Sequence, residues 1–141
     1  MSGIQNKHLE KIFPNWIPYF YGIICAILIP WTIFLAYLLP PKYISHNWDI
    51  AWTGFDIFML FLFASTAVLA VRRSAYTAIS SAMLATVILT DAWFDILTAK
   101  PGLAERRSIL EAIIVELPLA ILSFWLAQKI FQSVVKNKPN L

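Results

Sequence analysis

Carboxylates are the side chains of this sequence that could do chemistry, and several of them stand inside otherwise apolar segments. Asp56 lies within the segment FDIFMLF, Asp91 and Asp95 flank the tripeptide AWF, and Glu116 is followed by the apolar run LPLAIL. Such residues can hold a cation, exchange a proton or act as a general base. A carboxylate in apolar surroundings costs several kcal/mol unless it is paired, neutral or hydrated. These acids are therefore functional hypotheses.

The elements that must position these carboxylates are membrane-spanning helices. The chain has 141 residues, of which 60% are apolar and 13% charged, whereas a soluble domain carries roughly 25% charge. The apolar residues form long blocks, and a bilayer core about 30 Å thick needs about 20 such residues per helix. Four blocks qualify, at about residues 16–39, 50–71, 75–97 and 109–131. The sequence predicts an all-α membrane protein, an antiparallel four-transmembrane-helix bundle that occupies residues 1–141 as a single membrane domain.

Prolines and small residues indicate how these helices end, bend and pack. Pro40-Pro41 should end the first span, and Pro30 and Pro118 should kink the first and fourth, because proline removes a helical hydrogen bond. Small residues along one helix face let neighbours approach closely in a membrane. In the fourth span they share a stripe with Glu116, which should therefore point into the bundle, while Glu111 falls off this stripe. The small residues of the stripe are Ala112, Ala120, Ser123 and Ala127.

Charge is distributed unequally between the two ends of the predicted bundle. Seven basic residues lie on the side of the termini and of the Arg72-Arg73 turn, and four lie on the other side. Cytoplasmic loops carry the excess of Lys and Arg, so both termini should be cytoplasmic in a multi-pass protein of the cell (inner) membrane. Seven of the eight acidic residues then fall on the outer side.

The depth of the acids favours a common site. At a rise of 1.5 Å per residue, Asp56, Asp91 and Glu116 each lie about 9–10 Å inside their spans. Asp95 is one turn above Asp91, and Asp49 is two turns above Asp56, on the same helix faces. Three carboxylates at one depth cannot all stay ionised without cations. We expect a pocket with shared protons, a bound cation or basic partners. A structural network that ties the helices together is the alternative.

Aromatic residues and a histidine lie near the same level. Trp48, Trp52 and Trp93 are expected at a membrane interface as an aromatic belt. Together with the acids, Trp52 and Trp93 would also form an aromatic-walled pocket suited to an amine, a cation or a lipid head group. His46 is a weak candidate metal ligand at the mouth of this pocket, and a solvated loop histidine is the alternative.

Several classes of function leave no signature in the sequence. Nucleic-acid binding is rejected, because no basic face with interleaved aromatics lies outside the spans. Cys25 is the sole cysteine, which excludes an intrachain disulfide and a cysteine-based metal cluster within one chain. There is no nucleophile elbow, metalloprotease motif, phosphate-binding loop or dinucleotide fingerprint. Whether the protein is an enzyme therefore stays open, and no cofactor is predicted.

Three functions remain. The leading one is binding or conduction of a cation, a proton or a cationic small molecule through Asp56, Asp91 and Glu116, with Asp95, Asp49 and His46 at the entrance. A 16.1 kDa chain is small for a transporter, so we expect a homo-oligomer in the lipid bilayer. The rival functions are an enzyme that acts on a lipid at the outer leaflet, with one carboxyl as general base, and a non-catalytic accessory or assembly subunit.

Four segments carry a resemblance to other proteins: WDIAWTGFD (48–56), AVRR (70–73), DAWFD (91–95) and ELPLA (116–120). In these segments the chain resembles small, uncharacterised, four-span bacterial membrane proteins. The resemblance covers the second to fourth spans. It implies a four-span fold and brings no activity, cofactor or catalytic residue with it.

Overall fold

The computed structural model describes residues 14–39 and 46–136, and it consists of four long helices in that part of the chain. The first three are α2 (Trp16–Leu38), α3 (Trp48–Val71) and α4 (Thr77–Thr98). The fourth is continuous through α5 (Leu103–Glu111), η1 (Ala112–Glu116) and α6 (Leu117–Lys136). All four are long and apolar enough to cross a membrane. The predicted all-α four-helix bundle is confirmed, and the chain is a multi-pass membrane protein.

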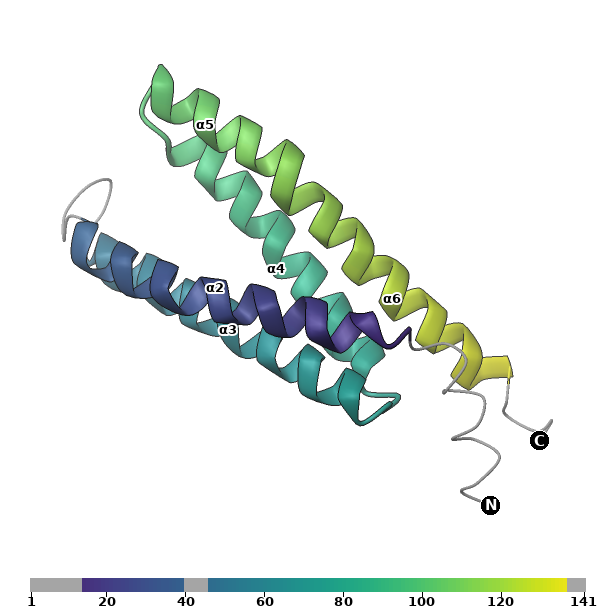
Figure 1. Cartoon of the computed structure of the whole chain (residues 1–141). Helices are drawn as coiled ribbons and strands as arrows, with labels where there is room; N and C mark the ends of the chain where they lie inside the picture. The colour runs from purple at the N-terminus through teal and green to yellow at the C-terminus, as the bar shows by residue number, and fades with distance from the viewer. Residues whose placement is uncertain (1–13, 40–45, 137–141) are drawn as a thin grey trace.

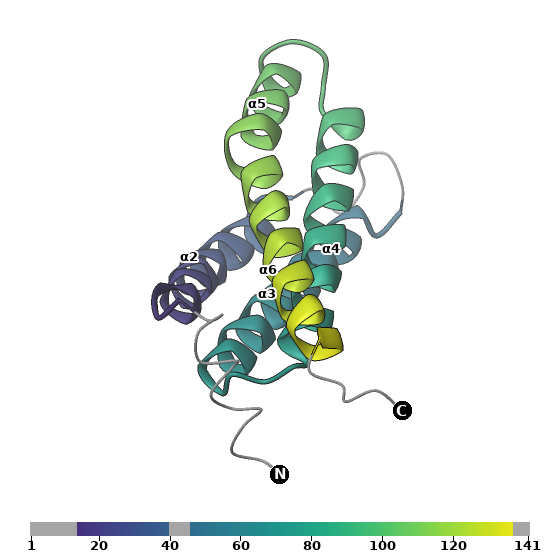
Figure 2. The ribbon, with the colours of Figure 1, turned by 90° about the vertical axis from the view of Figure 1, so that its right-hand side faces the viewer.

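The helices form two antiparallel hairpins that diverge toward one end (Figures 1 and 2). One hairpin pairs α2 with α3, and the other pairs α4 with the α5–α6 helix. Between the hairpins, α3 packs closely against α4, whereas α2, among the described helices, packs closely against α3 alone and reaches α6 through its Tyr21 side chain. We name the two ends of this arrangement. The closed end contains Trp16, the α3–α4 turn and Lys136, and the acidic end contains Leu38, Trp48, Thr98 and Leu103.

The closed end is tightly packed. Tyr21, Leu84, Ser123 and Ile130 are each 0% exposed. Short side chains allow this approach, since Ala120 and Ser123 of the predicted stripe are buried against the other helices. Two hydrogen bonds between hydroxyls cross between helices here. They join the Tyr21 hydroxyl to Ser123 Oγ and Thr66 Oγ1 to Ser80 Oγ, each at 2.8 Å.

The α3–α4 turn is longer than the predicted three residues, because α4 begins at Thr77 rather than Ala75. Arg73 adopts the left-handed conformation with φ 50°. The Ser74 and Arg73 amides donate to the carbonyls of Leu69 and Ala70, the Schellman pattern that ends a helix. The Thr77 hydroxyl then donates to the Ser74 carbonyl at 2.7 Å. Hydrogen bonds of the turn thus satisfy backbone carbonyls at the C-terminal end of α3 and in the turn itself.

The fourth span begins earlier than predicted, at Leu103, and runs for 34 residues. Residues 103–108 contain good helix formers, which makes a polar helical extension where we expected a loop. Gly102, with φ 110°, precedes it, and its amide donates to Glu105 Oε2 at 3.5 Å. At 1.5 Å per residue the helix measures about 51 Å, against a bilayer core of about 30 Å. Its first turns therefore extend beyond the apolar core.

The prolines affect their helices differently. The helix α2 continues through Pro30 without interruption. Pro118, by contrast, directly follows η1, a turn of π-helix. Proline in a helix interior clashes with the carbonyl four residues earlier, and a wider turn accommodates this. The expected break at Pro40-Pro41 lies outside the described residues.

Candidate functional site

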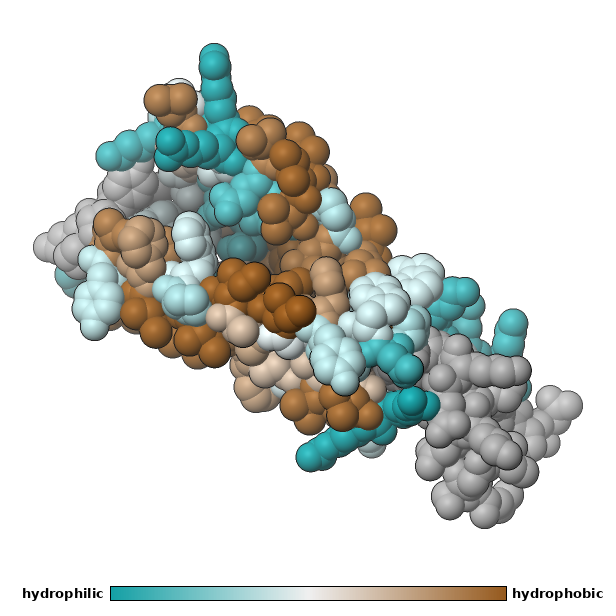
Figure 3. Space-filling model, in the orientation of Figure 1, coloured by the Kyte–Doolittle hydropathy of each residue, from teal (hydrophilic) through white to brown (hydrophobic). Residues whose placement is uncertain are grey.

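A cavity of about 840 Å³ lies between the two hairpins toward the acidic end. Figure 3 shows the hollow between the hairpins, with hydrophilic residues inside it and hydrophobic residues around it. All four spans contribute to its wall. The polar and aromatic side chains that line it include Trp31, Trp48, Trp52, Asp56, Asp91, Asp95, Thr98, Lys100, Ser108, Glu111 and Glu116.

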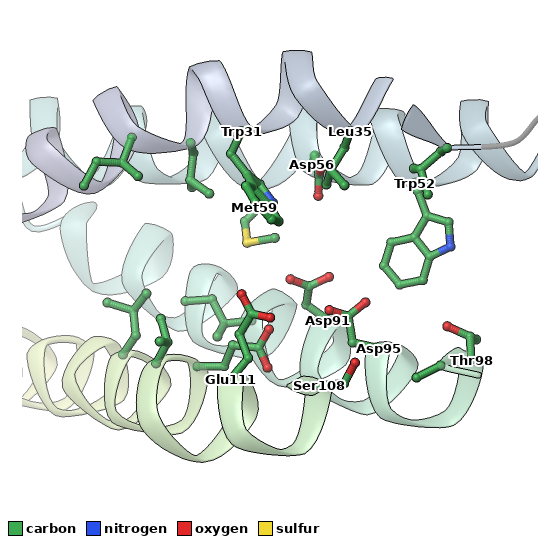
Figure 4. Close-up of a pocket in the computed structure, with 18 of the residues that line it drawn as sticks. Trp31, Leu35, Trp52, Asp56, Met59, Asp91, Asp95, Thr98, Ser108 and Glu111 are labelled. Atoms are coloured by element: carbon green, nitrogen blue, oxygen red, sulfur yellow. The ribbon is translucent and has the colours of Figure 1, made fainter. Parts of the chain in front are cut away.

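One face of α3 supplies the first carboxylate. Trp48, Trp52, Asp56, Met59 and Phe63 line the cavity, and their spacing of four, four, three and four residues places them on a single helical stripe. Asp56 points from this stripe toward the opposite wall in Figure 4. It is only 8% exposed, and its buried Oδ2 atom has no hydrogen-bond partner. A buried acceptor without a partner is rare in proteins and costs about 1–3 kcal/mol.

Two carboxylates enter from α4. Asp91 and Asp95 are one turn apart, and both point into the cavity across from Asp56 (Figure 4). Trp93 lies between them in sequence, but it is 64% exposed and does not line the cavity. Two residues along a helix correspond to a rotation of about 200°, so Trp93 is on the opposite face. The predicted aromatic wall is therefore built from Trp52, Trp48 and Trp31 instead.

The fourth span supplies two carboxylates, Glu111 and Glu116, rather than the one expected. Five residues of regular α-helix would turn Glu111 well away from Glu116, which is why it was placed off the stripe. The π-turn removes this difference. The Leu117 amide donates to the Ala112 carbonyl, five residues earlier, so residues five apart lie on one face. Glu116 Oε2 is buried without a hydrogen-bond partner, as Asp56 Oδ2 is.

The Asp91 carboxyl is within electrostatic range of the other four carboxylates of the cavity. Among residues 14–39 and 46–136, Lys100 is the basic residue that lines the cavity. Five carboxylates beside one lysine give the cavity an excess of negative charge, and such a site attracts positive charge or protons.

Two residues expected at the entrance do not line the cavity. His46 is exposed, and neither His46 nor Asp49 is among the residues that line the cavity. Asp49 is seven residues, or about 10 Å, nearer the end of α3 than Asp56. It lies in the first turn of α3, where a negative charge interacts favourably with the helix dipole. In residues 14–39 and 46–136, no three His, Cys, Asp or Glu side chains are grouped so that they could hold a metal ion.

Comparisons with known proteins give no indication of the function, so the proposal must come from the site. The chain matches no protein-family model. No similar curated protein and no similar solved structure was found. The resemblance of segments 48–56, 70–73, 91–95 and 116–120 to uncharacterised four-span proteins stays a prediction.

Several wall residues escaped the sequence prediction. The first span contributes Ile24, Leu28, Trp31 and Leu35, spaced as one helical face. This span is apolar all round, so no face of it stands out from sequence. Thr98 and Ser108 also line the cavity. Each is three residues from a wall carboxylate on the same helix, a spacing that could have identified them.

Proposed function

We propose that the protein binds a cation or a cation-bearing small molecule in the cavity between its hairpins. The positive charge would lie among Asp56, Asp91 and Glu116, as expected from their depth, although these acids are not grouped tightly enough to ligate one metal ion together. Asp95 and Glu111 would complete the acidic wall. The proposed site opens outward from the cell membrane, and both termini are cytoplasmic.

The observation that carries this proposal is the unpartnered Oδ2 atom of Asp56. If the acids only tied helices together, their buried oxygens would accept hydrogen bonds from neighbouring helices. Asp56 and Glu116 each have a buried oxygen that accepts none, and Asp56 faces the cavity. A positively charged donor in the cavity would supply the missing partner, and charge-assisted hydrogen bonds are the strong ones.

Binding is favoured over conduction because the cavity is blocked at the closed end. Tyr21, Leu84 and Leu126 lie between it and the closed end and are each at most 1% exposed. In this packed layer the hydroxyls of Tyr21 and Ser123 bond to each other, so they do not offer a charge a polar path through the bundle. In this arrangement of the helices the cavity is a blind pocket with access from one end and from its side.

The orientation rests on the distribution of basic residues, of which Arg72, Arg73, Lys129 and Lys136 lie at or near the closed end. The variant Ser74→Cys tests it, because Ser74 lies in the α3–α4 turn. A membrane-impermeant thiol reagent should label it only after the membrane is opened. Cys25 is replaced by serine in this variant and in the control protein, which keeps Ser74, so that only residue 74 can react with the reagent. Labelling in intact cells would place the closed end outside.

Binding is tested with purified protein in lipid nanodiscs. The probes are sodium, tetramethylammonium and dodecylamine, and the readout is the rise in unfolding temperature that a ligand of the folded state causes. At least one probe should raise the unfolding temperature of the wild type but not of Asp56→Asn. Glu105→Gln is the matched control, because Glu105 is exposed and does not line the cavity. If no probe acts, or if Asp56→Asn responds like the wild type, the proposal is wrong.

A further inference from the structure

The cavity has two chemical zones that follow one another along the helices. The acidic zone contains the five carboxylates. The apolar zone lies toward the closed end and is formed by Ile24, Leu28, Phe63, Ile88 and Leu119. Phe63 is seven residues beyond Asp56 on the same face of α3, which is about 10 Å along the helix. A ligand that fills both zones must therefore have a polar head and an apolar body.

The size of the cavity argues against a simple ion. A water molecule occupies about 30 Å³ of liquid, so a volume of about 840 Å³ is far larger than an ion and its first hydration shell require. It falls instead in the range of about 300–1,000 Å³ that is typical of sites for organic small molecules. The apolar zone offers no oxygen ligands to an ion. Filling it with an apolar body removes the partly exposed side chains of Ile24, Leu28 and Leu119 from water.

The side of the cavity faces the region that lipid occupies. The hairpins diverge toward the acidic end, and the hollow between them is open on one side of the bundle (Figures 1 and 3). Trp31 lines the cavity from α2 and is 46% exposed. An amphiphile dissolved in the bilayer could enter here, and an aromatic face beside the acids also attracts a cationic head.

We infer that the ligand is a lipophilic ammonium compound, whose head lies among Asp56, Asp91 and Glu116 and whose apolar body lies against Leu28, Phe63 and Ile88. This inference rests on the proposed function and names its ligand class. A phospholipid is disfavoured, because its phosphate would face five carboxylates with Lys100 as the basic residue of the wall. The carboxylates instead match a head that carries positive charge alone.

The test compares three probes on the wild type: dodecylamine, methylamine as the head alone, and dodecanol as the body alone. Equilibrium dialysis of radiolabelled probe against nanodiscs, with and without protein, separates binding from partitioning into lipid. Dodecylamine should bind roughly tenfold or more tightly than either of the others, because a charge-assisted hydrogen bond contributes about 1.5–3 kcal/mol.

Two variants separate the head from the body. Asp56→Asn should lower dodecylamine binding about tenfold, while Glu105→Gln leaves it unchanged. Leu28→Trp fills the apolar zone and should lower dodecylamine binding without affecting methylamine. Thermal unfolding and gel filtration test whether each variant is folded. If a variant does not fold, the comparison of the three probes on the wild-type protein still tests the inference.

The outcomes distinguish the two proposals. If methylamine binds as tightly as dodecylamine and depends on Asp56, the cation site stands and the inference of a lipophilic ligand is wrong. If dodecanol binds as tightly as dodecylamine and Asp56→Asn has no effect, both the cation site and the inference are wrong. In that case the cavity holds neutral lipid chains.

Discussion

The two ends of the bundle use the same four helices in different ways. At the closed end, short side chains and hydroxyl pairs such as Tyr21–Ser123 bring all the helices together. At the acidic end, carboxylates from three helices face one another across a cavity, and oxygens of Asp56 and Glu116 lack partners. The comparison teaches that stability is concentrated in one half of the molecule. The other half can therefore tolerate an arrangement of charges that does not stabilise the fold by itself.

Leu84→Ala tests the division of stability most strongly. Leu84 is fully buried at the closed end, so the substitution should lower the free energy of unfolding by about 2–5 kcal/mol. Leu35→Ala is the matched change at the acidic end, where Leu35 already borders a cavity. It should cost less than about 1 kcal/mol, because it leaves little new empty space. Chemical denaturation in detergent measures both. Equal losses would contradict the division.

Asp56→Leu should give the next largest effect, with the opposite sign. Removing a buried carboxyl without a hydrogen-bond partner should raise the free energy of unfolding by about 1–3 kcal/mol while it abolishes binding of dodecylamine. The same denaturation assay and nanodisc dialysis measure the two effects. A loss of stability would instead assign Asp56 a structural role between helices.

Tyr21→Phe should cost about 1 kcal/mol, because it removes the hydroxyl that pairs with Ser123 within the membrane. A double-mutant cycle with Ser123→Ala isolates the pair. The coupling should be roughly 0.6–1.7 kcal/mol, and a coupling near zero would mean that packing alone holds the closed end. Dodecylamine binding should not change in either variant, since neither residue lines the cavity.

Asp49→Asn should have the smallest effect. Its charge lies in the first turn of α3, where the interaction with the helix dipole contributes roughly 0.3–1 kcal/mol. Dodecylamine binding should stay within about twofold of the wild type, given that Asp49 does not line the cavity. A loss comparable to that of Asp56→Asn would restore the entrance role that the sequence suggested.

The four spans could be predicted because lipid demands long apolar helices, and this demand is visible in every block of the sequence. The grouping of Asp56, Asp91, Asp95 and Glu116 could also be predicted, since depth along a regular helix follows from residue number. Trp93 lies outside the cavity because helix periodicity turns it away from Asp91 and Asp95, and its expected place in an interfacial aromatic belt stays a prediction.

Other features depend on how the helices pack against one another, and the residue pattern within a single helix does not determine this packing. The hydroxyls of Tyr21 and Ser123 are 102 residues apart in sequence, and their pairing follows only from the packing of α2 and α6. The divergence of the hairpins was likewise invisible, because α2 is apolar on every side. Glu111 was missed for a local reason, since the prediction assumed a regular α-helix before Pro118.

The π-turn of η1 has a consequence for the length of this segment. It holds one residue more per turn than an α-helix would, as an insertion does. Deleting Ile113 would let the segment become a regular α-helix without rotating its flanks, because Glu111 and Glu116 would then be four residues apart and still on one face. With the length unchanged, a regular α-helix in place of the π-turn would instead rotate Glu111 and Ser108 by about 100° relative to α6 and out of the cavity. The acidic wall therefore depends on the backbone conformation of this turn as well as on the identity of its residues.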